Sequence, residues 1–165
     1  MDRDFFSRLW TFHHWANGKT FDALASVSAQ ELDKPWGGSF KNGRGLLQHV
    51  VGGDRIWVDR WNGTSTKSAP QFPPTHGGRE FRDEWQKVKA DQRRYFDSLT
   101  PQKLQSSLTY TNLRGETHTW PMTDLIYHLV NHGTYHRGQM TQLLRDLGQG
   151  APATDFTVYL ITETR

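Results

Sequence analysis

The sequence predicts an all-α fold: a four-helix bundle with a small hairpin or irregular ribbon before the last long helix. Four stretches place apolar residues at steps of three and four, which is the spacing of one helix face. All seven prolines lie outside these stretches. At 165 residues the chain has the size of one compact domain, so we expect a single bundle domain over residues 1–165.

The first helix is expected from residue 5 to about residue 27, where no proline interrupts the pattern. Its predicted core positions are Phe5, Leu9, Phe12, Ala16 and Leu24. Ser28 followed by Glu31 then has the form of a capping box. Pro35 and the pair Gly37-Gly38 predict a loop that leads to the second helix.

The second helix is expected over residues 43–61 and to end at Asn62-Gly63. Its apolar stripe consists of Leu46, Val50, Gly53, Trp57 and Trp61. Three prolines among Ser, Thr and Gly then predict an extended surface connection over residues 63–78. This connection is long enough to cross the molecule.

The third helix is expected over residues 79–99, with a less regular stripe, and Thr100-Pro101 resembles the cap and first position of a short turn. The stripe consists of Phe81, Trp85, Val88, Phe96 and Leu99. Residues 104–120 alternate around a turn at residues 112–115, which predicts the hairpin or ribbon.

The fourth helix is expected over residues 122–147, with Gly148 as its C-terminal cap. Its stripe is the clearest in the chain and consists of Leu125, Leu129, His132, His136, Met140, Leu143 and Leu147. Residues 156–161 fit a strand or a short helix equally well.

Composition excludes several classes of protein. The chain has no cysteine, so a transition metal would have to use imidazole and carboxylate ligands. A net charge of +3, with Lys and Arg scattered among acids, does not indicate nucleic-acid binding. No run of about 18 apolar residues occurs and the opening residues are charged, so we expect a soluble, cytoplasmic protein without a membrane partner.

His132 and His136 lie one helical turn apart within an apolar stripe. Burying an imidazole costs free energy unless its nitrogens find partners, and two imidazoles at this spacing can bind one metal ion. The alternative is that both are hydrogen-bonded core residues, because His-x3-His spacings also arise by chance in a chain with eight histidines.

His49 is the best candidate for a third ligand, because it flanks the stripe of the second helix and bundle sites draw ligands from facing helices. His128 forms a second His-x3-His with His132 but lies to one side of the stripe. It is the runner-up ligand, and otherwise a neighbour of the site or an interface residue.

Four other polar residues each have two possible roles. His13 and His14 are adjacent and point in different directions, so one could face the site, although surface and core positions are favoured. Gln139 fits either a residue that orients a ligand or substrate, or a hydrogen bond at the edge of the core. Arg137 points away from the stripe, which favours a salt bridge or a dimer contact. No nucleophile elbow, phosphate-binding loop, dinucleotide fingerprint or His-Glu-x-x-His motif occurs.

The chain resembles the DinB/YfiT-like family of bacterial metalloenzymes. The resemblance rests on Trp15-Ala16-Asn17, on Leu46-Leu47-Gln48-His49 and above all on the stretch from His132 to Gln139. It implies an up-down-down-up four-helix bundle, a homodimer, and a site of His49, His132 and His136 that holds zinc or nickel.

Relatives in that family include thiol-dependent S-transferases and a thiol-dependent isomerase. The resemblance therefore implies a metal-dependent enzyme that activates a thiol or water, for S-transfer to a small electrophilic molecule or for its hydrolysis. Its partners would be that small molecule and a low-molecular-weight thiol. Three histidines leave coordination positions open, as a catalytic site requires. The alternative is a non-catalytic, stress-associated bundle protein whose metal only ties two helices together.

Overall fold

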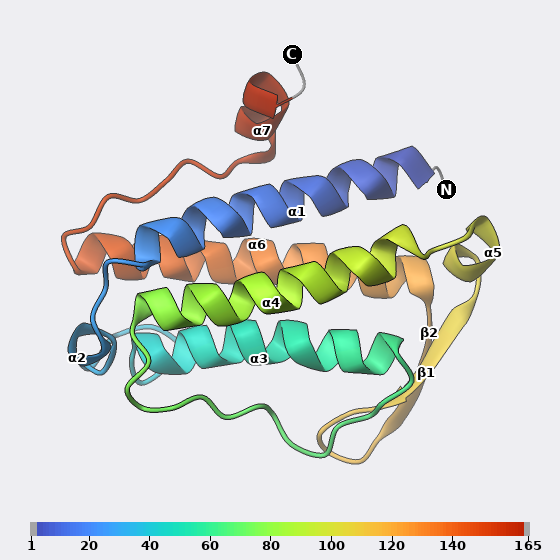
Figure 1. Ribbon diagram of the computed structural model, residues 1–165, viewed down its shortest axis with the longest axis horizontal. Coiled ribbons are helices and arrows are strands. Elements are labelled where there is room, and N and C mark those ends of the chain that lie inside the picture. The colour runs from blue at the N-terminus through green and yellow to red at the C-terminus, as the bar shows by residue number, and fades with distance from the viewer. Residues whose placement is uncertain (1–2, 164–165) are drawn as a thin grey trace.

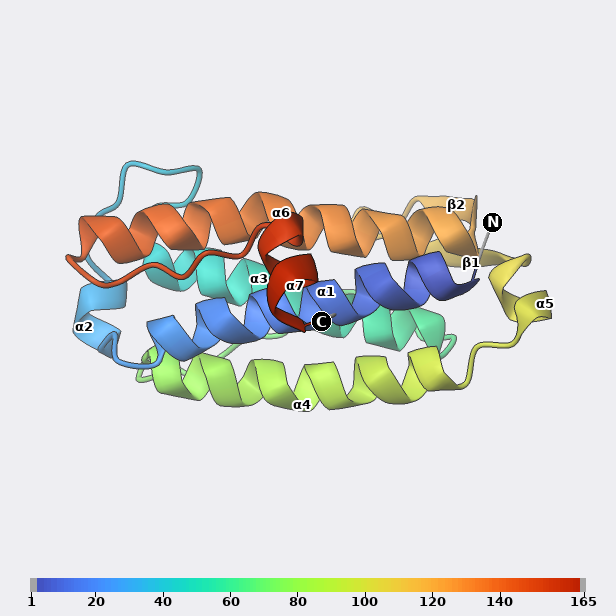
Figure 2. The same cartoon turned by 90° about the horizontal axis from the view of Figure 1, so that it is seen from above.

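Four long helices lie side by side in the computed structural model, which describes residues 3–163 (Figures 1 and 2). They are α1 (Arg3–Leu24), α3 (Gly43–Trp61), α4 (Gly78–Asp97) and α6 (Met122–Asp146). Helix α1 packs against α4 and α6, and α3 packs against the same two helices. The chain is mostly helical, as predicted; residues 1–2 and 164–165, the ends of the expected domain, lie outside the described residues.

The short elements lie around these helices. Helix α2 (Ala29–Leu32) begins with the predicted capping box, and α5 (Pro101–Leu104) follows the predicted cap at Thr100. Strands β1 (Ser107–Thr111) and β2 (Thr117–Pro121) form an antiparallel hairpin, which confirms the predicted one. The tail forms α7 (Phe156–Glu163), so the undecided segment is a helix, and it packs across α1 (Figure 2).

The direction of each long helix follows from the connections. In Figure 1, α1 and α6 run from the hairpin end toward α2, whereas α3 and α4 run toward the hairpin. The connection between α3 and α4 contains no regular element and crosses the length of the molecule, as predicted. Helices α3 and α6 therefore run antiparallel and pack against each other.

The buried face of α1 differs from the predicted one. Phe5, a predicted core position, is 43% exposed. The face of α1 that is buried against the other long helices consists instead of Phe6, Trp10, His13, Asn17, Phe21 and Leu24. Their spacings are again four and three, but two of the six are polar, so a search for apolar residues selects the wrong face. Phe12 and Ala16, correctly predicted as buried, pack instead against Tyr159 of α7.

A layer of buried polar side chains divides the core. One apolar cluster includes Phe21, Trp85 and Met140 near α2, and another includes Trp10, Trp61 and Leu129 near the hairpin. Between them, at mid-height of the helices, lie His13, His14, Asn17, Asp54, Gln92, His136 and Arg137. This polar layer is the environment from which the candidate site is built.

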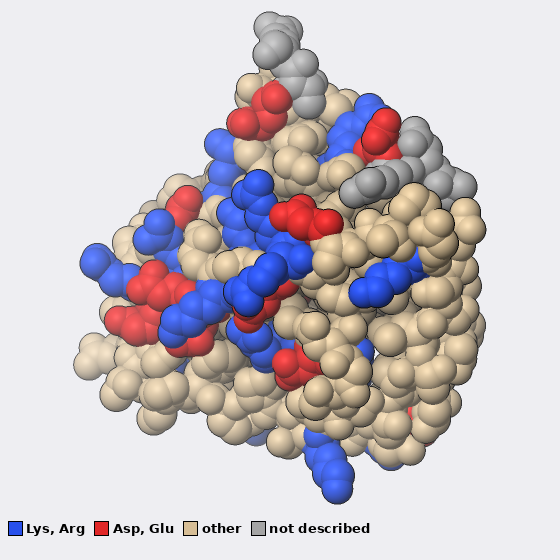
Figure 3. All heavy atoms as spheres, turned by 45° about the vertical axis from the view of Figure 1, so that its right-hand side comes forward, with Lys and Arg blue, Asp and Glu red and all other residues tan. Residues whose placement is uncertain are grey.

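The surface shows no single-sign block in the view of Figure 3. Basic and acidic side chains are interspersed there, beside an area with few charges. Among residues 3–163, no helix combines the length and the apolar character that a membrane crossing needs.

Candidate metal centre

Three imidazole nitrogens converge between α3 and α6. The Nε2 atom of His49 lies 3.1 Å from the Nε2 atoms of both His132 and His136, and these two are 3.0 Å apart. The structure thus brings together the three histidines that the sequence analysis selected, in a group that can hold a metal ion. We call this group the histidine triangle.

The size of the triangle fits a transition metal. Imidazole nitrogens bind zinc at about 2.0–2.1 Å, so separations of 3.0–3.1 Å correspond to angles of about 90–100° at a shared ion. Such angles lie between octahedral and tetrahedral values. Three ligands at these angles occupy one side of an ion and leave the other side open.

Gln139 sets the protonation of one imidazole. Its Oε1 atom lies 2.6 Å from Nδ1 of His136, and a carbonyl oxygen can only accept a hydrogen bond. Nδ1 of His136 therefore carries the proton, and Nε2 presents a lone pair to the triangle, which is the tautomer that binds a metal. This contact supports the ligand-orienting role considered for Gln139.

Desolvation within the triangle favours the neutral form of all three imidazoles. It is the largest cause that lowers the pKa of His132 to about 3, with further contributions from His136, His49 and His128. Desolvation is also the largest cause that lowers the pKa values of the solvent-facing His49 and of the buried His136. Because only neutral imidazole has a lone pair to give, these shifts favour metal binding.

The triangle opens to solvent on the side of His49. His136 is 4% exposed, as its place on the stripe predicts, but His132 is only partly buried and His49 is exposed. The ring of Phe40 lies 5.2 Å from that of His49, and Ser39 Oγ accepts a hydrogen bond from Gln139 Nε2. Sequence reasoning missed Phe40 and Ser39, because they lie in a loop without periodicity.

His128 adjoins the triangle without joining it. Its ring centre is 5.6 Å from that of His132 and 5.3 Å from that of Trp57. Among the described residues, the group of potential ligands contains only the other three histidines. His128 is therefore a neighbour of the candidate site.

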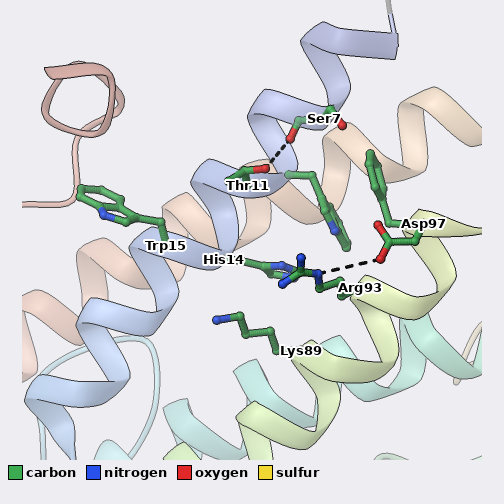
Figure 4. A pocket seen from close by; sticks show the side chains of 9 residues that line it. Ser7, Thr11, His14, Trp15, Lys89, Arg93 and Asp97 are labelled. Atoms are coloured by element: carbon green, nitrogen blue, oxygen red, sulfur yellow. Dashed lines mark hydrogen bonds and ion pairs between the residues drawn. The ribbon is translucent and has the colours of Figure 1, made fainter. Parts of the chain in front are cut away.

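His13 and His14 both occupy core positions. Figure 4 shows His14 pointing from α1 toward α4, where its Nε2 atom lies 3.0 Å from Gln92 Oε1. The ring of His13 is fully buried against Gly133, and its Nε2 atom lies 3.3 Å from Asn17 Nδ2. Neither histidine belongs to the triangle.

The expectation for Arg137 needs correction. Its side chain points away from the triangle, as predicted, but it is 2% exposed, so it cannot form a surface contact with a second copy. Its guanidinium donates hydrogen bonds to Asn17 Oδ1 and Thr134 Oγ1 and lies over the ring of Phe12. A buried guanidinium needs such partners, which ties α1 to α6.

Comparisons with known proteins agree with this arrangement. A model of the DinB family matches residues 2–165. Protein DinB of Bacillus subtilis (strain 168) is 26% identical over 162 residues, which cover 95% of this chain and 94% of that protein. The crystal structure of a DinB-like protein from Bacillus cereus ATCC 10987 superposes with a TM-score of 0.70 at 21% identity, covering 90% of this chain and 94% of that one, which supports the fold. From the match of the family model over nearly its whole length, the chain belongs to the DinB family.

Proposed function

We propose that His49, His132 and His136 hold one divalent transition-metal ion, zinc or nickel, and that the protein is a metal-dependent enzyme. Its reaction would be S-transfer from a thiol to a small electrophilic molecule, or hydrolysis of that molecule by water. The observation that carries the proposal is the convergence of three Nε2 atoms, one with its lone pair set by Gln139, at a position open to solvent.

A bound divalent ion would lower the pKa of a thiol or water in an open coordination position, so that a nucleophile forms at neutral pH. Gln139 and Phe40 of this chain would support that chemistry. Gln139 holds the Nδ1 proton of His136 and so keeps that ring in one orientation. Phe40 covers part of the triangle with an apolar ring, while the exposed side of His49 leaves a path for a small molecule.

The alternative is a non-catalytic, stress-associated bundle protein whose metal ties α3 to α6. It is favoured by the hydrogen bonds of the triangle, which among the described residues reach only one another and Gln139. Among the described residues, no carboxylate is hydrogen-bonded to these three rings. A separate acid or base would therefore have to come from the substrate, the thiol or water.

The catalytic and the structural hypotheses predict different effects on turnover and melting temperature when one metal ligand is removed. The test uses zinc-loaded and nickel-loaded protein with a panel of cellular thiols and electrophiles, in the wild type, in His49→Ala and in the hairpin control His118→Ala. Catalysis predicts turnover that His49→Ala abolishes and His118→Ala retains, with a small change in melting temperature because His49 is exposed. A large fall in melting temperature without turnover in any wild-type assay supports the structural reading.

We extend the proposal to the architecture and to the partners. The helix directions in Figure 1 support an up-down-down-up bundle. Tyr127 and Tyr135, 58% and 62% exposed on α6, support a homodimer contact on that helix. Light scattering of the wild type and of the double variant Tyr127→Ala/Tyr135→Ala tests the dimer, whose mass should halve in the variant.

A further inference from the structure

A cavity of about 250 Å³ lies beside the histidine triangle, at the hairpin end of the same two helices. We call it the aromatic pocket. Three of its lining residues are large aromatics from three different elements, and the full lining is Trp57, Tyr110, Trp120, Asp124, Leu125 and His128. Tyr110 and Trp120 come from β1 and β2, so the hairpin closes one side of the pocket.

The pocket and the triangle share one row of contacts between α3 and α6. His49 contacts His136, a Cβ on Gly53 would lie 3.6 Å from His132, and Trp57 contacts His128. Each step along the row is four residues, or about 6 Å of helix. The pocket therefore begins about one helical turn from the triangle, with the imidazole of His128 between them.

The inner wall of the pocket is rigid and aromatic. Trp57 is 7% exposed and meets Tyr110 edge-on, with ring centres 5.2 Å apart. The guanidinium of Arg60 lies 4.7 Å from the ring centre of Trp57 and 4.4 Å from that of Tyr110, so one cation contacts both rings. Such a wall favours a flat partner that can stack or pack edge-on.

The outer wall is an unusually exposed aromatic. Trp120 is 50% exposed, although an indole offers a large apolar surface that would ordinarily be buried. Within the described part of the chain, the polar side chains that line the pocket along with these rings are His128 and Asp124, both on α6. The pocket thus combines aromatic surface with a few polar groups on one side, as small-molecule sites do.

We propose that the aromatic pocket binds the flat, conjugated part of the electrophilic substrate, whose reactive carbon then lies toward the histidine triangle. The class that fits is an aryl-substituted electrophile, such as an α,β-unsaturated carbonyl compound with a single ring. The ring fills the pocket, and its carbonyl arm spans the helical turn to the triangle. This inference rests on the proposed function, because it assigns the substrate of that site.

The first experiment measures binding of methyl cinnamate to the zinc-loaded full chain by ligand-detected NMR. Trp120→Ala removes the outer wall and should weaken binding about three- to tenfold, which is the range expected for one aromatic pair. Trp120→Phe keeps a ring and should bind nearly as the wild type does. Phe5→Ala, which removes a ring that is 43% exposed on α1 and does not line the pocket, is the matched control.

The second experiment locates the probe relative to the triangle. In protein loaded with cobalt(II), the vinyl and ester protons of methyl cinnamate should relax faster than the ring protons, and no such difference should appear with zinc. Equal relaxation of all protons, or equal binding by Trp120→Ala and Phe5→Ala, overturns the inference. If the protein takes up neither metal, the proposed function fails, and the Trp120 series on metal-free protein still decides whether the pocket binds the probe.

Discussion

Asn17 Oδ1 accepts a hydrogen bond from Arg137 Nη1 at 3.0 Å, in the buried polar layer between α1 and α6. This bond joins two of the three sequence stretches on which the family resemblance rests, Trp15-Ala16-Asn17 and the stretch from His132 to Gln139. Because Arg137 directly follows His136, the bond also fixes the turn of α6 that carries two members of the histidine triangle.

Replacing Asn17 by Ala should lower the free energy of unfolding by about 1–3 kcal/mol, because the buried guanidinium loses a hydrogen-bond acceptor. Urea denaturation at pH 7 measures this change. Asn131→Ala, an exposed position on α6, should stay within about 0.5 kcal/mol of the wild type. Equal stabilities of the two variants would show that the Asn17 bond contributes nothing.

Replacing Gln139 by Ala should weaken zinc binding about 10- to 100-fold, because the proton on Nδ1 of His136 loses its acceptor. Competition with a chelator of known zinc affinity measures the change. Gln142→Ala is the control, since that exposed side chain bonds to Asp146 on the surface of the same helix and not to the triangle. Unchanged affinity in Gln139→Ala would contradict the orienting role.

Replacing Gly133 by Ala should destabilise the fold by about 1–3 kcal/mol through overpacking. A Cβ there would lie 2.5 Å from Cε1 of His13, whose ring is fully buried. Gly138→Ala meets nothing within 4 Å and should instead stabilise the helix by up to about 1 kcal/mol. Thermal unfolding of both variants checks the pair, and stabilisation by Gly133→Ala would refute the close packing.

Asp54 makes the stability depend on pH. Its carboxyl group is 2% exposed, and burial raises its pKa from 3.8 to about 7, an effect that Trp85 and Gln92 partly offset. The folded state therefore keeps a proton that the unfolded chain has already released above pH 4. The stability that this retained proton contributes to the folded state is fully present below about pH 4 and is lost as the pH rises through 7.

Asp54→Asn stays neutral at every pH, so its stability relative to the wild type should increase between pH 4 and pH 7. The gain at pH 8 should be on the order of 2–4 kcal/mol, measured by urea denaturation across this range. The two proteins differ only at residue 54, so the difference isolates Asp54. A difference that stays constant with pH would contradict the raised pKa.

Local signals predict the elements of this fold well. Helix α3 begins and ends at the expected residues, because Asn42 caps its first turn and Asn62-Gly63 ends it. The face of α1 was not predictable by hydrophobicity, because His13 is buried against Gly133 of α6 and Asn17 is bonded to Arg137 of the same helix. Such tertiary contacts leave no periodic signal in the sequence.

The candidate site also contains residues that the sequence pattern predicts and residues that it does not. Helical phase selects His132 and His136, whereas His49 is exposed beside its stripe and was selected mainly through the family resemblance. Phe40 and Ser39 reach the site from a loop, where position depends on the path of the chain. Gln139 could be placed near the site by phase, but its bond to His136 depends on side-chain conformation.

The central claim, that the histidine triangle holds a metal ion, is tested most directly by the metal content of untagged protein purified without chelator. Elemental analysis should find about one zinc or nickel ion per chain in the wild type and in His118→Ala. His49→Ala, His132→Ala and His136→Ala should each lose most of it. Wild-type protein that contains no transition metal, and takes up none on titration with zinc, nickel, iron or manganese, would contradict the claim.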